Sequence, residues 1–255
     1  MTLTTLKKGI GRSAVLCLMV AILASCSSAT VFPTASSGKS TGTSAGVDFA
    51  PGLEAFNAGD YSTAHRLWQL AAQFGDAEAE NGLGWLYAGG LGVPQDHQEA
   101  VKWYQRAASR GNGGAQLNLA NHYYYGLGVP QNDAEAARLF GEASSRGYVV
   151  AQNNLARMYK EGRGVPQRPD LAASWMKRAA EGGFPPAQNS LGLMYFEGDG
   201  VPQDYQQAWI WFELAVRNGV PGAEHNRDFV ASFLTDDQRA AAEEQVTRRQ
   251  PRAGT

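Results

Sequence analysis

Residues 90–95 read GLGVPQ, and the same short motif returns three times further along the chain. It stands as GLGVPQ at 126–131, as GRGVPQ at 162–167 and as GDGVPQ at 198–203, so the spacing is 36 residues each time. A fixed period in the range of roughly 20–50 residues is typical of stacked supersecondary units, none of which can bury its apolar face alone. The motif therefore predicts a repeat protein.

Other residues keep the same register. The recurring positions are Ala100, Ala136, Ala172 and Ala208; Gly111, Gly147, Gly183 and Gly219; Leu83, Leu119, Leu155 and Leu191; and Tyr87, Tyr123, Tyr159 and Tyr195. Small residues let helices approach one another, and bulky residues fill the space between them. Trp103, Trp175 and Trp211 are accordingly expected in the core.

Each unit is predicted to contain two antiparallel helices. Ala100, Trp103 and Tyr104 are spaced as one apolar helical stripe, and a second helix runs from about residue 114 to 125 and ends at the Gly-x-Gly. Helix-start signals recur at a fixed distance before each stripe. They are the capping-box pairs Asp96/Glu99, Asn132/Glu135 and Asp204/Gln207, the Arg168-Pro169 pair of the third unit, and Thr235/Gln238 before the last predicted helix.

The stretch AQNNLARMYKEGRGVPQRPDLAASWMKRAAEGG (151–183) resembles the Sel-one-like repeat, a relative of the tetratricopeptide repeat. Four such repeats span 77–220, and a helix pair resembling a tetratricopeptide unit precedes them at 48–76. Residues 221–255 leave the period and are expected to form a capping helix and a frayed tail. The resemblance implies an all-α fold, an α/α superhelical solenoid of antiparallel helix pairs.

The N-terminus has the pattern of a secretory signal. Three basic residues precede an apolar run at 14–24, which is shorter than the roughly 20 residues that a membrane-spanning helix needs. LASC (23–26) resembles a bacterial lipobox, which implies cleavage after residue 25 and lipid attachment at Cys26. Residue 27 is Ser and not Asp, the usual inner-membrane retention signal of known lipoproteins. We therefore expect an outer-membrane lipoprotein that faces the periplasm. Residues 26–47 are expected to form a flexible tether.

Charge and histidine placement exclude two classes of function. From residue 26 onward the chain carries 19 basic and 24 acidic residues, a net charge of 19 − 24 = −5, which disfavours nucleic-acid binding. His65, His97, His122 and His225 fall at four different repeat phases, so we expect surface or rim histidines and no metal site. GLGVPQ is no phosphate loop, because helical periodicity precedes it and the third glycine is missing. No cofactor is predicted.

The face of the second helices that points away from Leu83 and Tyr87 is the predicted binding surface, which the resemblance places in a concave groove. Its residues are Asn81, Trp85, Leu117, Asn121, Tyr124, Tyr125, Asn153, Arg157, Lys160, Asn189, Leu193 and Phe196. These positions differ from unit to unit, whereas the stacking positions barely vary. For Tyr124 and Phe196, packing between units is an alternative to partner binding.

The sequence favours a non-enzymatic adaptor that binds an envelope protein or peptide and touches the membrane only through its lipid. An envelope hydrolase acting on β-lactam or cell-wall substrates is the alternative from another class, and a structural spacer is a third. Some cysteine-rich relatives of the family are linked to β-lactams. They carry paired cysteines in each repeat, which this chain lacks.

Overall fold

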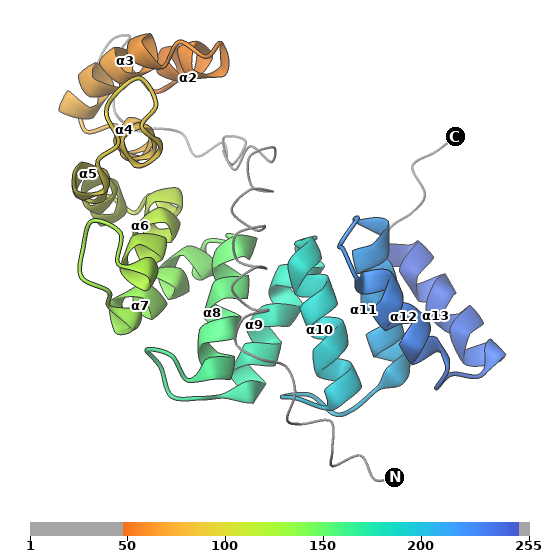
Figure 1. The fold of residues 1–255 in the computed structure, drawn as a ribbon. Coiled ribbons are helices and arrows are strands. Elements are labelled where there is room, and N and C mark those ends of the chain that lie inside the picture. The colour runs from red at the N-terminus through yellow and green to blue at the C-terminus, as the bar shows by residue number, and fades with distance from the viewer. Residues whose placement is uncertain (1–47, 250–255) are drawn as a thin grey trace. The chain divides into compact units, whose positions relative to one another are not determined.

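The structure, a computed structural model, describes residues 48–249. The signal-like segment, Cys26, the tether and residues 250–255 lie outside the described residues. Within 48–249 the chain forms twelve helices and no strand, which confirms the all-α prediction. They are α2 (Ala50–Asn57), α3 (Tyr61–Gln73), α4 (Ala77–Gly89), α5 (His97–Ser109), α6 (Gly113–Tyr125), α7 (Asp133–Ser145), α8 (Val149–Glu161), α9 (Pro169–Glu181), α10 (Pro185–Glu197), α11 (Tyr205–Arg217), α12 (Ala223–Ala231) and α13 (Asp236–Arg249) (Figure 1).

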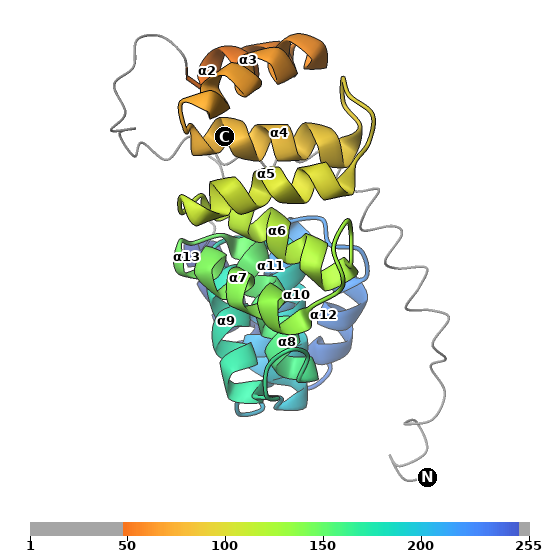
Figure 2. The ribbon, with the colours of Figure 1, turned by 90° about the vertical axis from the view of Figure 1, so that its left-hand side faces the viewer.

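The helices pack in chain order. Consecutive helices from α2 to α12 pack against each other, and α13 packs back on α11. Figure 2 shows α2 to α7 layered one after another, as expected for a solenoid in which each repeat contacts only its neighbours. We call α4, α6, α8, α10 and α12 the ladder helices; the first four carry the predicted binding face.

The Gly-x-Gly motif shapes each connection between a ladder helix and the next helix. Its first glycine ends the helix in the left-handed conformation, as at Gly162, where φ is +68°. Its second glycine also has positive φ and approaches the preceding repeat very closely. A Cβ placed on Gly164 would lie 2.2 Å from the carbonyl oxygen of Asp133, the first residue of α7. The same contact forms between Gly128 and His97, so the motif joins repeats as well as helices.

The helix-start predictions are confirmed at the side chains that act as N-caps. Asp96 Oδ1 accepts hydrogen bonds from the backbone N–H groups of Gln98 and Glu99, at 2.9 and 3.0 Å. The reciprocal half of the capping box is wrong here, because the Asp96 N–H donates to the Tyr87 carbonyl and the Glu99 carboxylate pairs with Lys102. The backbone bond that replaces it recurs in the other three Gly-x-Gly connections and closes each loop.

The same cap recurs at Asn132 and Asp204. Arg168 gives no side-chain cap, and Pro169 starts that helix, as predicted. Thr235 and Gln238 form the complete capping box, in which each side chain accepts from the other residue's backbone N–H.

The core contains alanines and large apolar side chains at several repeat positions. The alanines at the recurring positions are fully buried, and one of the large positions is occupied by Trp68, Tyr104, Phe140, Met176 and Phe212. Another is occupied by Leu83, Leu119, Leu155 and Leu191. The prediction for the neighbouring tryptophans holds only for Trp211. Trp103 and Trp175 are half-buried, with guanidinium groups of the same helix over their rings. The large side chain that packs among the alanines in every repeat is therefore the residue directly after the tryptophan position.

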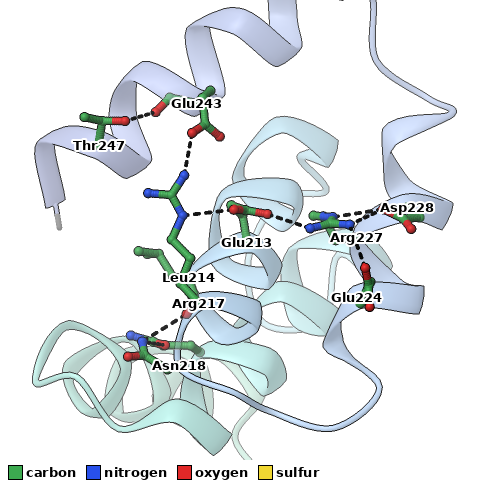
Figure 3. Close-up of polar contacts among 10 residues, drawn as sticks. Glu213, Leu214, Arg217, Asn218, Glu224, Arg227, Asp228, Glu243 and Thr247 are labelled. Atoms are coloured by element: carbon green, nitrogen blue, oxygen red, sulfur yellow. Dashed lines mark hydrogen bonds and ion pairs between the residues drawn. The ribbon is translucent and has the colours of Figure 1, made fainter. Parts of the chain in front are cut away.

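The C-terminal cap is held by an ion-pair network. Glu213 on α11 lies between Arg217 and Arg227, with N–O distances of 2.9 and 3.0 Å (Figure 3). Arg227 belongs to α12, and Arg217 also pairs with Glu243 on α13, so one network connects three helices. α12 lies beyond the last Gly-x-Gly motif but keeps one position of the repeat register. Its buried Ala223 stands 36 residues after the equally buried Ala187.

The contact between Gly164 and Asp133 can be tested by substitution, with Gly141 as the matched control. We expect Gly164→Ala to lower the free energy of unfolding by at least about 2 kcal/mol, because left-handed strain alone costs roughly 1–3 kcal/mol and the new methyl overlaps Asp133. Gly141 lies inside α7, where an added methyl would have no neighbour within 4 Å, so Gly141→Ala should stabilise by up to about 1 kcal/mol. Urea denaturation followed by circular dichroism measures both, and equal effects would contradict the contact.

Candidate functional site

One position of the ladder helices changes chemistry in every repeat. Counting in steps of 36 residues, it is occupied by Trp85, Asn121, Arg157, Leu193 and Phe229. Trp85 is 41% exposed, Leu193 37% and Phe229 52%, although all three are large apolar side chains. We call this series the variable row. Asn121 and Arg157 are half-buried, and Phe229 lies beyond the predicted face, on α12.

The predicted face is less open elsewhere. Asn81, Leu117, Asn153 and Tyr124 are buried, whereas Lys160 and Tyr125 are exposed. Asparagines connect neighbouring repeats: Asn118 Nδ2 donates to Asn81 Oδ1 at 3.1 Å. The same bond runs from Asn226 on α12 to Asn189 on α10, again at 3.1 Å.

Tyr124, on α6, contacts side chains of α8 and of the loop that follows α8. The Arg163 guanidinium lies 3.6 Å above its ring centre and donates to its backbone carbonyl at 3.0 Å. Arg163 also pairs with Asp133 at 2.8 Å, and this hydrogen bond holds the pKa of the Asp133 carboxyl below its usual value. Arg157 Nη2 donates to the Tyr124 hydroxyl at 3.2 Å. Tyr124 is thus fixed on two sides by cations.

A small pocket opens beside this tyrosine. It is lined by Asn121, Tyr124, Tyr125, Phe140, Asn154 and Arg157, and it encloses about 10 Å³. That volume holds roughly one water-sized group, so the pocket suits a single terminal atom of a side chain and is too small for a whole ligand.

Phe196 lies in an aromatic cluster near the C-terminal end of the row. Its ring contacts Tyr205, Phe229 and Phe233, with centroid distances of 5.7, 5.7 and 6.0 Å. Phe229 and Phe233 remain about half exposed. Packing between units, the alternative foreseen for Tyr124 and Phe196, is what the structure shows for both side chains.

Sequence reasoning missed Asn154, Phe229 and Phe233 as residues of this face. The signal for the two phenylalanines was present: Ala223 falls in phase with Ala187 and predicts one more ladder helix. Asn154 follows Asn153 directly, and its presence in the pocket depends on a helix rotation that spacing alone gives only approximately.

The repeated helix pairs match a known protein family. The model of the Sel1 repeat matches residues 52–76, 77–112, 114–148, 149–184 and 185–220. The chain belongs to the Sel1 repeat family. The match at 52–76 extends the family to the leading helix pair, beyond the four repeats counted from the sequence. No curated protein sequence matches the chain.

Solved structures agree with this assignment. A Sel1 repeat protein from Oxalobacter formigenes is 27% identical, with a TM-score of 0.68 over 82% of this chain and 86% of that one. The protein c5321, a protective antigen of uropathogenic Escherichia coli strains with an SLR fold, is 29% identical, with a TM-score of 0.51 over 74% of this chain. The match covers 49% of c5321, about half of its length.

The described part of this Sel1 repeat chain contains no group of three or more His, Cys, Asp or Glu side chains able to hold a metal ion. Among the same residues, no helix has both the length and the apolar character needed to cross a bilayer.

The prediction of rim histidines is wrong for His122. This residue is buried on α6, 5.5 Å from the His97 ring by centroid distance, at a position where other repeats have Leu86, Met158 and Met194. His122 Nδ1 lies 2.9 Å from the Asn118 carbonyl, which can only accept, so Nδ1 carries the proton. Its Nε2 is buried without a hydrogen-bond partner among the described residues. Burial lowers the pKa of His122, and the nearby His97 adds to this effect.

Replacing His122 tests whether its burial makes the stability of the chain depend on pH. Because the pKa of His122 is lower in the folded than in the unfolded chain, the unfolded chain binds more protons near pH 6, and stability falls as the pH drops below about 6.5. His122→Met should reduce this loss and stabilise the chain by about 1 kcal/mol at neutral pH by removing an unpaired buried nitrogen.

Urea denaturation at about pH 5.5 and about pH 7.5, on either side of the ordinary histidine pKa, compares the variant with wild type. His225→Gln is the control, since His225 is exposed on α12 and its replacement should leave the difference between the two pH values unchanged. An unaltered pH difference in His122→Met would contradict the assignment.

Proposed function

We propose that this chain is a non-enzymatic interaction module that captures a protein or peptide of the bacterial cell envelope on its variable row. The observation that carries the proposal is the contrast between positions. The recurring alanine, glycine, leucine and tyrosine positions repeat one residue, and the large core position stays apolar, whereas the row offers an indole, an amide, a guanidinium, an isobutyl group and a phenyl ring in succession. A surface freed from stacking constraints can match one partner.

Family membership supports the general class. Sel1 repeat proteins generally mediate protein–protein interaction, and their fold is typically a non-catalytic scaffold. The residue types of the row add to this argument. Tryptophan and arginine are enriched among the residues that dominate binding energy, and large apolar groups exposed to solvent gain the most from being covered.

The surface is largely formed before a partner arrives. Arg163 and Arg157 hold Tyr124, and asparagine pairs join α4 to α6 and α10 to α12. A preformed surface loses little side-chain entropy on binding, which favours affinity. Such a face suits an amphipathic helix or an extended segment laid across the ladder helices.

The row can be tested by removing two of its apolar groups. Leu193→Ala with Phe229→Ala should weaken partner binding by at least about 2 kcal/mol, because both side chains are exposed and their burial is lost. A photo-crosslinking amino acid placed at Leu193 in cells identifies the partner, and calorimetry with that partner measures the loss.

Lys177 on α9 provides the matched control. It is exposed and has only a long contact of 3.9 Å to Glu181, so Lys177→Ala should bind as wild type and a crosslinker there should capture nothing. Equal crosslinking at both positions, or full binding by the double variant with unchanged helicity, would refute the row as the binding surface.

We further propose that the chain is anchored to the outer membrane through Cys26. The basic segment, the short apolar run and the LASC stretch support this anchor. Two or more acyl chains anchor a protein stably, whereas one alone binds membranes marginally.

Cys26→Ser should abolish incorporation of labelled palmitate and move the chain from the membrane fraction to the soluble periplasmic fraction. Ser27→Asp is the companion variant, and it should move the lipidated chain to the inner membrane. Membrane retention of Cys26→Ser would show that another element anchors the chain.

A further inference from the structure

We propose that the pocket beside Tyr124 binds an acidic side chain, so that the partner presents an aspartate or glutamate to Arg157. This inference rests on the proposed function of the variable row and names the chemistry of one contact within it.

The first argument is the set of contacts that Arg157 makes. It is the cation of the variable row, half-buried on α8, and its hydrogen bond goes to the neutral hydroxyl of Tyr124. Within residues 48–249, no carboxylate lies within ion-pair distance of it. The neighbouring cations differ: Lys160 pairs with Asp199 and Arg163 pairs with Asp133, each at 2.8 Å. Arg157 is thus placed to meet a negative charge supplied from outside.

The second argument is the hydrogen-bonding inventory of the pocket. Asn154 Oδ1 accepts from Asn153 at 3.4 Å, which leaves the Asn154 amide N–H₂ as a donor. Asn121 contributes a second amide, and the guanidinium of Arg157 has N–H groups beyond the one that Tyr124 accepts. Donors therefore outnumber acceptors around a small opening, and the complementary group is an anion that only accepts.

The third argument is size and shape. The enclosed volume of about 10 Å³ beside the Phe140 ring holds one water-sized group, which matches a single carboxylate oxygen with the rest of the side chain at the mouth. A carboxylate is planar and accepts two parallel hydrogen bonds from a guanidinium, the strongest geometry open to Arg157. Tyr125, which is exposed at the rim, can cover the aliphatic part of an aspartate or glutamate.

The test uses synthetic peptides and the purified full chain. A random peptide library displayed on phage is selected on the wild-type chain, and binders are synthesised with each Glu or Asp changed singly to Gln or Asn. We expect one acidic residue whose amide version binds at least about tenfold more weakly. Arg157→Gln should abolish that preference while leaving the amide peptide's affinity unchanged.

Two further variants protect the result against misfolding. Asn121→Leu places at this repeat position the residue that the next-but-one repeat has as Leu193, so the stack accepts it, and it should reduce the acidic preference by severalfold. Arg157→Lys keeps the charge but loses the bidentate geometry, and it should keep part of the preference. Thermal unfolding of each variant verifies its fold.

The outcomes separate the two proposals. Equal binding of acid and amide peptides to the wild type, or an acidic preference that survives Arg157→Gln, overturns the carboxylate pocket. A preference that follows the peptide's C-terminal carboxylate and vanishes on C-terminal amidation also overturns it. If Leu193→Ala with Phe229→Ala leaves every selected peptide bound at wild-type affinity, or if no peptide is selected, the variable row itself fails.

Discussion

The repeat architecture depends on the contact between the second glycine of each motif and the first turn of the preceding repeat. A Cβ on Gly200 would lie 2.1 Å from the carbonyl of Pro169, and Gly92, Gly128 and Gly164 make the corresponding approach to Tyr61, His97 and Asp133. No side chain fits at such a distance, and the positive φ of these residues also favours glycine. The motif therefore fixes how far one repeat stands from the next.

Buried side chains add to this backbone contact in stacking the repeats. Each repeat contributes alanines and several large apolar residues to the core, and the buried polar contacts differ between repeats. Glu80 is fully buried and pairs with Arg106 and Arg110 at 2.9 and 3.3 Å, whereas Gln116 and Gln152 occupy the same position in later repeats. A charged and a neutral solution coexist at one position, because the glycine contact and the alanines already specify the stack.

The sequence predicted the fold well because its signals are local and repeated. Helix ends follow from glycine conformation and N-cap chemistry, so the capping roles of Asp96 and Asp204 could be derived from spacing. The candidate site was predicted only in outline. A helical period gives the direction of a side chain but not the position of the next helix, so it could not show that Asn81 bonds to Asn118 or that His122 is buried. The role of Arg163 could not be predicted for the same reason, because its contacts are with Asp133 and Tyr124, in other parts of the sequence.

Arg163 connects stability with recognition in this chain. It occupies the variable position inside the Gly-x-Gly motif, braces the first turn of α7 through Asp133, and stacks on Tyr124. Tyr124 in turn accepts the hydrogen bond that orients Arg157. A motif whose glycines hold two repeats together thus carries, between them, the side chain that fixes the binding face. Because the residue at this position changes along the chain, from Leu91 and Leu127 to Arg163 and Asp199, each joint can brace the row differently without disturbing the stack.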